Sequence, residues 1–330
     1  VVAESNPNGI CVIDRDNNRR WEYIPEKGVM GTPGNAIPWR DGFLFSDRYK
    51  HIISYITYDK KVTTLYGKYK QPDNVYGTLC APHCVWASVN ESSIYICDTL
   101  DGKVIEIDPD SKRIKWEYGD ADFYGSENNM LWHPNVIQTT CSDKVLICDS
   151  MNHIVRLIDK NHGVVFEYGK PRIRRCEFKL PRSVQILDKS ILVSDTHHHR
   201  VIEIDMDGRI KWEFGNANRN SDEKTLFFPR CAYKNRKGTI IADAGNFRLI
   251  KLDSDNNIEK IFEYLNYKGN RIQIVDPHYI FPVNDSMYLL VDSGQDTVLL
   301  FNYDGDVMWK YDDLKDPHCA KITQSNGVLV

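Results

Sequence analysis

The chain has 330 residues, of which 42% are hydrophobic, 27% charged and 11% aromatic. This composition excludes a fibrous or intrinsically disordered chain. The formal net charge is −4, so the sequence lacks the basic surplus of a dedicated nucleic-acid-binding protein. No apolar run approaches the ~18 residues of a membrane span, and no signal peptide is visible.

The nine cysteines form neither a CxxC pair nor a compact disulfide framework. Several recur at equivalent places in aliphatic segments, as Cys97 and Cys148 do in two copies of Ile-Cys-Asp, and there they resemble small buried hydrophobic residues. We therefore expect a soluble monomer in a reducing, cytoplasmic compartment, with neither a nucleic-acid nor a membrane partner.

One pattern recurs along the whole chain: an aliphatic segment that ends in an acidic residue. A polar turn, a second aliphatic segment and a turn rich in Asp, Asn and Gly follow. A last segment carries an aromatic pair such as Trp116-Glu-Tyr118 or Trp212-Glu-Phe214. Such runs between turn residues predict strands, and no long segment has the helical period. The acidic residues lie 43 to 51 residues apart and are Glu4, Asp47, Asp98, Asp149, Asp195, Asp243 and Asp292.

Each repeat predicts four strands, A to D, and a lone four-stranded sheet cannot bury both faces. We expect an all-β, seven-bladed β-propeller of four-stranded blades, forming a single domain over residues 1–330. From Asp292 through the C-terminus and on to Glu4 is 42 residues, close to one repeat. The segment 317–330 should therefore pair in the same blade as residues 1–23, so that no edge is open. The repeated acidic residues should cap turns, and the aromatic pairs should pack between blades.

Three copies of the turn after the acidic residue carry a family resemblance. Asp149-Ser-Met-Asn-His-Ile-Val, Asp195-Thr-His-His-His-Arg-Val and Asp243-Ala-Gly-Asn-Phe-Arg-Leu resemble the NHL repeat. The Trp-Glu-Tyr-Gly endings and Trp132-His-Pro-Asn135 are more similar to the propeller of bacterial arylsulfotransferases. The resemblance covers most of the chain and implies a propeller. It implies little about function, because NHL propellers include both enzymes and binding scaffolds.

A proline precedes the first strand of each repeat, and the residue after it is polar where packing alone would favour an aliphatic one. Strand A is innermost in a propeller, so this position should lie at the mouth of the central channel. The alternative interpretation is that these groups only line a water-filled channel. The residues at this position are His83, Asn135, Arg182, Arg230, His278 and His318, with Asn35 in the one repeat whose alignment shifts.

The order of the repeats places the histidines on one arc and the arginines on the opposite arc. His83, His278 and His318 could hold a divalent metal ion, such as zinc, with the fourth position open. Arg182 and Arg230 suit a carboxylate, sulfate or phosphate. No acidic residue occupies this position in any repeat, so we expect the arginines to lack an internal acidic partner. Among NHL propellers, the peptide α-amidating lyase resembles this plan, with a histidine-ligated zinc beside an arginine.

Other polar residues near these positions are secondary candidates. His197 should lie in the loop between strands B and C, and with Asn35 and Asn135 it is a candidate for substrate binding. His153 and His199 occupy the repeat's own His/Arg position, which favours a structural role. His133 precedes its proline and is out of phase, but the arylsulfotransferase resemblance makes it a catalytic candidate.

These observations predict an enzyme whose active site is at the channel mouth, a metal-assisted lyase or hydrolase acting on a small anionic substrate. His83, His278 and His318 would hold the metal, and Arg182 and Arg230 would bind the anion. Two alternatives remain open. One is metal-independent, arylsulfotransferase-like group transfer by a histidine and the arginines. The other is an NHL-type scaffold that binds a peptide or protein on its top face.

Overall fold

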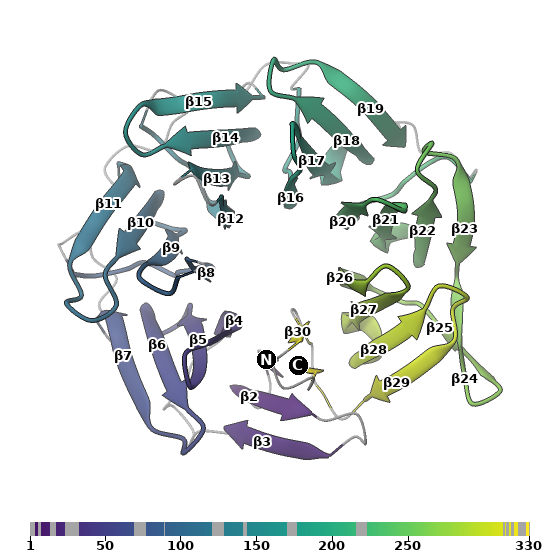
Figure 1. Ribbon diagram of the computed structural model, residues 1–330, viewed down its shortest axis with the longest axis horizontal. Coiled ribbons are helices and arrows are strands. Elements are labelled where there is room, and N and C mark those ends of the chain that lie inside the picture. Colours follow the sequence, from purple (N-terminus) through teal and green to yellow (C-terminus); the bar gives the residue numbers. More distant parts are fainter. Residues whose placement is uncertain are drawn as a thin grey trace. The chain divides into compact units, whose positions relative to one another are not determined.

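The computed structural model describes residues 4–5, 8–13, 18–23, 33–68, 77–88, 90–120, 129–140, 144–169, 177–215, 223–312, 314, 317, 320–322 and 328–329 (Figure 1). The chain divides into two compact units, Val1–Glu22 with Arg182–Val330, and Tyr23–Pro181. The single domain over residues 1–330 stays a prediction. The described residues contain β-strands and three short 3₁₀ turns but no α-helix, and no helix among them could span a membrane.

The unit Tyr23–Pro181 contains three four-stranded antiparallel sheets, each built from strands consecutive in the sequence. Short turns between β-branched and aliphatic runs favour such meanders, because each strand can pair at once with the one before it. The strands are β4 (Pro33–Trp39), β5 (Gly42–Asp47), β6 (Ile52–Thr57), β7 (Val62–Gly67), β8 (Cys84–Ala87), β9 (Ile94–Asp98), β10 (Lys103–Ile107), β11 (Ile114–Gly119), β12 (Pro134–Thr139), β13 (Lys144–Asp149), β14 (Ile154–Asp159) and β15 (Gly163–Tyr168).

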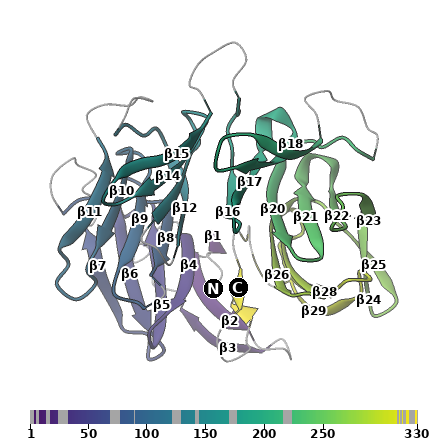
Figure 2. The same cartoon turned by 45° about the horizontal axis from the view of Figure 1, so that its top comes forward.

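The other unit repeats this plan in three further four-stranded sheets and adds a hairpin. The hairpin, β24 (Tyr264–Tyr267) and β25 (Asn270–Gln273), was not expected, and β24 contacts β29 (Figure 2). The sheet strands are β16 (Ser183–Ile186), β17 (Ser190–Asp195), β18 (Arg200–Asp205), β19 (Ile210–Gly215), β20 (Pro229–Asn235), β21 (Gly238–Asp243), β22 (Arg248–Leu252), β23 (Ile258–Phe262), β26 (Pro277–Asn284), β27 (Met287–Asp292), β28 (Thr297–Asn302) and β29 (Val307–Tyr311).

The two ends of the chain share one sheet. Strands β1 (Glu4–Ser5) and β3 (Arg19–Tyr23) pair with β2 (Asn8–Ile13), and β2 also pairs with β31 (Val328–Leu329), which pairs with β30 (Lys321–Ile322). The predicted pairing of the chain ends is therefore observed.

The expectation of seven four-stranded blades is wrong, because six sheets among the described residues have four strands. The sheet of the chain ends differs because the N-terminal repeat contributes only the two-residue strand β1 where the other repeats have strand B. The two-residue strands β30 and β31 complete it from the other end of the chain.

The repeated aspartates cap turns, as predicted. Asp149 accepts the Trp132 backbone N–H at 2.7 Å, and Asp243 accepts that of Phe227 at the same distance. Each carboxylate thereby ties the end of its own strand B to the segment that leads into strand A. Asp149 also accepts from Asn152 in the following turn. Because both carboxylate oxygens are used, these buried groups position the strands and are not a catalytic pair.

The aromatic pairs of the last strands stack on one another and are largely buried. Trp116 and Tyr118 lie with ring centroids 6.2 Å apart, and Trp309 and Tyr311 repeat the arrangement at 6.3 Å. The prediction that these residues pack within the core is confirmed, since Tyr118 and Trp309 are 8% and 3% exposed.

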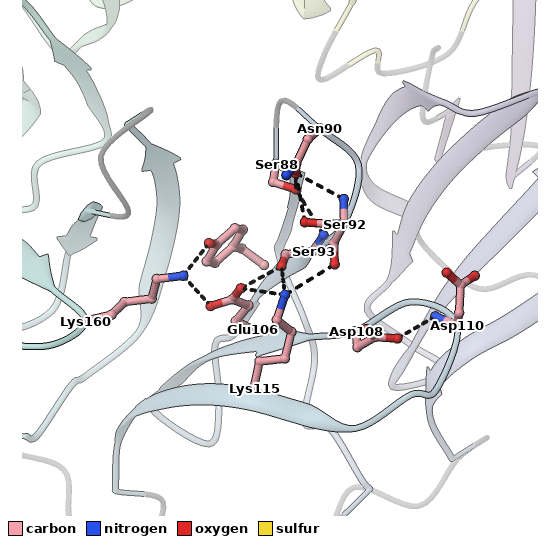
Figure 3. A network of polar contacts seen from close by, with 10 residues as sticks. Ser88, Asn90, Ser92, Ser93, Glu106, Asp108, Asp110, Lys115 and Lys160 are labelled. Carbon is pink, nitrogen blue, oxygen red and sulfur yellow. Dashed lines mark hydrogen bonds and ion pairs between the residues drawn. The ribbon is translucent and has the colours of Figure 1, made fainter.

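Charged side chains tie consecutive sheets together at two equivalent positions. Glu106 in β10 accepts from Ser93 at 2.6 Å and from Lys160, which follows β14 in the next sheet, at 2.7 Å (Figure 3). In the other unit, Glu203 in β18 accepts from Lys234 of β20 at 2.6 Å. Hydrogen-bonded lysines compensate the cost of burying each carboxylate.

Candidate functional site

Two hydrogen bonds from the repeat that contains Asp195 fix the entry to the first strand of the following sheet. Thr196, which follows Asp195, donates its hydroxyl to the Pro229 carbonyl at 2.9 Å. His199 adopts a left-handed backbone conformation, and its Nδ1 accepts the Phe228 N–H at 3.2 Å. The residue directly after Pro229 is therefore held in a defined direction, and this residue is Arg230.

Other repeats use one or both of these contacts. The hydroxyl contact recurs from Thr99 to Pro134 and from Ser150 to Pro181. His153 accepts the Leu180 N–H at 3.1 Å, and His51 accepts the Ala81 N–H at 2.9 Å. The structural role predicted for His153 and His199 is confirmed, because each imidazole accepts a backbone N–H from the segment that leads to a strand entry.

In the unit that contains Arg182–Val330, three of the residues around the strand entries form a charged cluster. Arg230, in β20, donates from Nη1 to Nδ1 of His278, in β26, at 2.9 Å. Its Nη2 lies 3.1 Å from Oδ2 of Asp276. The Arg230 and Asp276 side chains are 28% and 31% exposed, so solvent screens their ion pair only in part. One guanidinium thus donates hydrogen bonds to both a carboxylate and an imidazole.

Arg182 lies at the edge of this cluster, directly before β16. Its backbone N–H donates to the Ser194 carbonyl at 3.1 Å, which continues the pairing of β16 with β17. Surrounding protein lowers the pKa of its exposed guanidinium by partial desolvation, the positive charge of Arg230 lowers it further, and Asp276 raises it. No hydrogen bond or ion pair joins the Arg182 guanidinium to any residue that the structure describes.

The contact with Arg230 determines the tautomer of His278. A guanidinium carries only N–H donors, so Nδ1 of His278 must accept and cannot carry a proton. The imidazole is therefore neutral, with its proton on Nε2. In this state His278 presents a hydrogen-bond donor at Nε2 rather than a lone pair.

In the unit Tyr23–Pro181, both predicted asparagines form hydrogen bonds with other parts of the protein. The Asn35 amide accepts the Val85 N–H at 2.8 Å and donates to the Val85 carbonyl at 3.1 Å, joining two consecutive sheets. Asn135 donates to the Ser150 hydroxyl at 3.1 Å. Gln185 makes the same paired contact with Lys234 in the other unit. The hydrogen bonds of Asn35 thus match those of a structural amide.

Two predicted histidines of this unit lie at strand entries. His83 is half-buried, and its backbone N–H donates to the Cys97 carbonyl at 3.2 Å. His133 has a left-handed backbone conformation before its proline. Burial lowers the pKa of His133, and the positive charge of Arg48 lowers it further. His133 and Arg48 therefore lie close together in this unit.

Two further predicted residues are His197 and His318. His318 lies outside the described residues. His197 packs its ring edge-on against Phe228, with centroids 4.9 Å apart. Within the described ranges, no group of three or more His, Cys, Asp or Glu residues is arranged to hold a metal ion. The metal site of His83, His278 and His318 stays a prediction.

Sequence reasoning missed two charged residues, and both occupy repeat positions that could have revealed them. Asp276 precedes its proline where other repeats have Ala81 or Leu180, so it is a charged departure at a strand entry. The expectation that the arginines lack an internal acidic partner is wrong for Arg230, which pairs with Asp276. Arg48 follows Asp47 at a position where most repeats have a serine or threonine, so a charged side chain stands in place of the hydroxyl.

No protein-family model matches the sequence, and no curated protein is similar enough to count as a relative. Among solved structures, a streptogramin B lyase has a TM-score of 0.65 with 12% sequence identity, covering 90% of this chain and 89% of that one. Virginiamycin B lyase from Staphylococcus aureus has a TM-score of 0.63 with 14% identity, covering 90% and 93%. The dihydro-heme d1 dehydrogenase NirN has a TM-score of 0.60 with 12% identity, covering 99% of this chain and 66% of that one.

At these identities the likeness shows the fold and not the activity. The resemblance to NHL repeats and to arylsulfotransferases stays a prediction. The repeated four-stranded antiparallel sheets and the three structural neighbours together identify the chain as an all-β protein with the β-propeller fold.

Proposed function

We propose that this protein is an enzyme that acts on a small anionic substrate at the cluster of Arg182, Arg230 and His278, by lyase or hydrolase chemistry. The observation that carries the proposal is the double contact of Arg230, with His278 at 2.9 Å and with Asp276 at 3.1 Å. A structural salt bridge needs only the carboxylate. The added imidazole, beside a second arginine, supplies a hydrogen-bond donor next to an anion-binding group.

The roles follow from the chemistry of each group. Arg182, with no acceptor among the described residues, would bind the negative charge of the substrate, and a planar guanidinium can do so through two hydrogen bonds. The Nε2–H of neutral His278 would donate to the oxygen that gains negative charge as a bond breaks. Donors held in place before the reaction stabilise such charge because no reorganisation is needed. Asp276 is a positioning residue, because it orients Arg230 and touches no reacting atom.

The tautomer of His278 bears on the metal-dependent version of this function. A metal ion at Nε2 needs a lone pair there and a proton on Nδ1, which would then face the Arg230 N–H. A nucleophilic role in group transfer needs the same lone pair. In the observed arrangement His278 fits neither role, so the proposed chemistry uses it as a neutral donor. His83 and His318 could still belong to a metal site that does not include His278.

The comparisons support an enzyme without identifying its reaction. Two of the structural neighbours are named as lyases, and a virginiamycin B lyase in which one histidine is replaced by alanine is described as catalytically inactive. These statements concern those proteins. They make it plausible that a propeller of this type carries an essential histidine.

The test is a turnover screen of small carboxylate, sulfate-ester and phosphate-ester substrates with the purified protein, followed by variants. His278→Ala and Arg182→Gln should each abolish any turnover found, while His162→Ala, an exposed histidine paired with Asp159, should leave it unchanged. Turnover that survives both His278→Ala and Arg182→Gln would place the active site elsewhere. Metal analysis of the same sample tests the metal-assisted version directly.

A further inference from the structure

We propose that Arg182 binds a singly charged oxoanion and that Asp276 sets this preference over doubly charged anions. This inference rests on the proposed function, since it names the substrate class of the same cluster. The candidate ligands are carboxylates and sulfate monoesters, which share one negative charge and two or more acceptor oxygens.

The formal charges of the cluster give the first argument. Arg182 and Arg230 each carry one positive charge, and Asp276 carries one negative charge. His278 is neutral, because its Nδ1 accepts from Arg230. Asp276 forms its ion pair with Arg230. Among these four side chains one positive charge is therefore left over, and it resides on Arg182. The neighbouring Asp292 carboxyl accepts the Asp276 N–H, and burial raises its pKa.

The positions of these charges give the second argument. Asp276 is close enough to Arg182 to act on it electrostatically, although its ion pair is with Arg230. An anion at Arg182 is therefore attracted by both guanidinium groups and repelled by the Asp276 carboxylate. A monoanion neutralises the cluster. A dianion leaves one negative charge beside Asp276 in surroundings less polar than water, where like charges repel more strongly than in solvent.

The third argument is geometric. Arg182 directly precedes β16, Arg230 lies in β20 and His278 lies in β26. These first strands of three successive sheets contact one another, β16 with β20 and β20 with β26. Their rigid backbones hold the donors in place before a ligand arrives. Such preorganisation reduces the entropy lost on binding.

Methyl sulfate and methyl phosphate provide matched probes, because both are tetrahedral monoesters and differ by one charge at pH 8. A phosphate monoester loses its second proton near pH 6 and is a dianion at pH 8, whereas methyl sulfate is a monoanion. Isothermal titration calorimetry of the wild-type protein should show methyl sulfate binding about tenfold more tightly than methyl phosphate. At pH 5 both are monoanions, so the difference should largely disappear.

Variants separate the two residues. Arg182→Gln should remove binding of methyl sulfate, while Arg236→Gln, at an exposed position that follows β20, should not. Asp276→Asn keeps an oxygen that can accept from Arg230 but removes the negative charge, so it should raise the affinity for methyl phosphate at pH 8 about tenfold. Asp285→Asn, an exposed position between β26 and β27, is the control for charge alone.

Each outcome bears on the proposal. Equal or tighter binding of the dianion by the wild-type protein overturns it, as does absence of methyl sulfate binding at millimolar concentration or binding that persists in Arg182→Gln. The wild-type comparison stands even if Asp276→Asn fails to fold. Selective binding without any turnover would reject the proposed enzyme but keep the anion site. Turnover that depends on His278, together with a preference for dianions, would keep the enzyme and reject the monoanion site.

Discussion

Arg230 lies 2.9 Å from Nδ1 of His278, and this contact decides which nitrogen of the imidazole carries the proton. The two residues are separated by 48 positions in the sequence and belong to consecutive sheets. The packing of one sheet against the next therefore sets the hydrogen-bonding state of a side chain at the candidate site.

The first prediction concerns this tautomer. At pH 7, nitrogen NMR of the labelled protein should show His278 protonated on Nε2 alone. Arg230→Ala removes the donor, so both neutral tautomers should become populated. His162 serves as a reference signal because it is exposed. A wild-type His278 protonated on Nδ1 would refute both the assignment and the role proposed for it.

The second prediction concerns stability in mild acid. Burial lowers the pKa of His51, whose Nδ1 accepts the Ala81 N–H. The folded state therefore binds this proton more weakly than the unfolded state, and stability is lost as pH falls below about 6.5, the unperturbed histidine value. Glutamine at this position can accept the same N–H without titrating. His51→Gln should thus reduce the loss of unfolding free energy between pH 7.5 and pH 5.5, measured by urea denaturation.

Buried aspartates act in the opposite direction, which is why the wild-type and His51→Gln proteins must be compared at each pH. Burial raises the pKa of Asp149 to about 7, so the folded state binds this proton more tightly than the unfolded state does. Protonation of Asp149 therefore favours the folded state as pH falls. This contribution is common to both proteins and cancels in the difference. An equal pH dependence in the two proteins would show that the His51 contact does not couple protonation to folding.

The third prediction concerns a buried ion pair in β13 and β14. Arg156 and Asp149 are both 0% exposed, with Nη1 and Oδ2 3.2 Å apart. Arg156→Met leaves the Asp149 carboxylate buried without its counter-charge, which should lower the unfolding free energy by about 3–5 kcal/mol. Because the pKa of Asp149 is raised, protonation relieves this loss, so the deficit should be smaller at pH 5 than at pH 8. The double variant Arg156→Met with Asp149→Asn should recover part of it.

The fourth prediction concerns the contact between β18 and β20. Lysines and a serine lower the pKa of the Glu203 carboxyl to about 2 against the cost of burial. A depressed pKa stabilises the fold above the unfolded value of about 4.3, and this stabilisation is lost as pH falls through that range. Glu203→Gln should lower the unfolding free energy by roughly 2–3 kcal/mol at pH 7, because a tenfold change in proton affinity corresponds to about 1.4 kcal/mol and solvent screens part of the interaction.

The same substitution should have a smaller effect at pH 3, because the unfolded-state carboxyl is then protonated and part of the stabilisation is already lost, although the folded-state carboxyl is still largely ionised. Urea denaturation at the two pH values measures the difference. The exposed Glu223→Gln is the control and should have little effect at either pH. A loss of stability in Glu203→Gln that is as large at pH 3 as at pH 7 would argue against a charge-dependent contact.

The sequence by itself determined the period of the repeat and the strands within it. It also determined the turn-capping role of Asp149 and Asp243 and the pairing of the two chain ends. These features depend on local patterns: alternating turns and β-branched runs, and one acidic residue per repeat. The same repeat brought attention to Arg182, Arg230 and His278, because equivalent positions in successive units lie at equivalent places in their sheets.

Tertiary structure alone decided which of those side chains meet. Asp276 and Arg230 are separated by 46 positions, and no local pattern pairs them. Asn35 has the polarity of a binding residue, yet its amide is used by the Val85 backbone 50 positions away. The count of four-stranded sheets also differed, because the N-terminal repeat has only β1 in place of a full strand B. Contacts between sheets depend on how whole sheets pack, and that packing is set by many side chains at once rather than by any single motif.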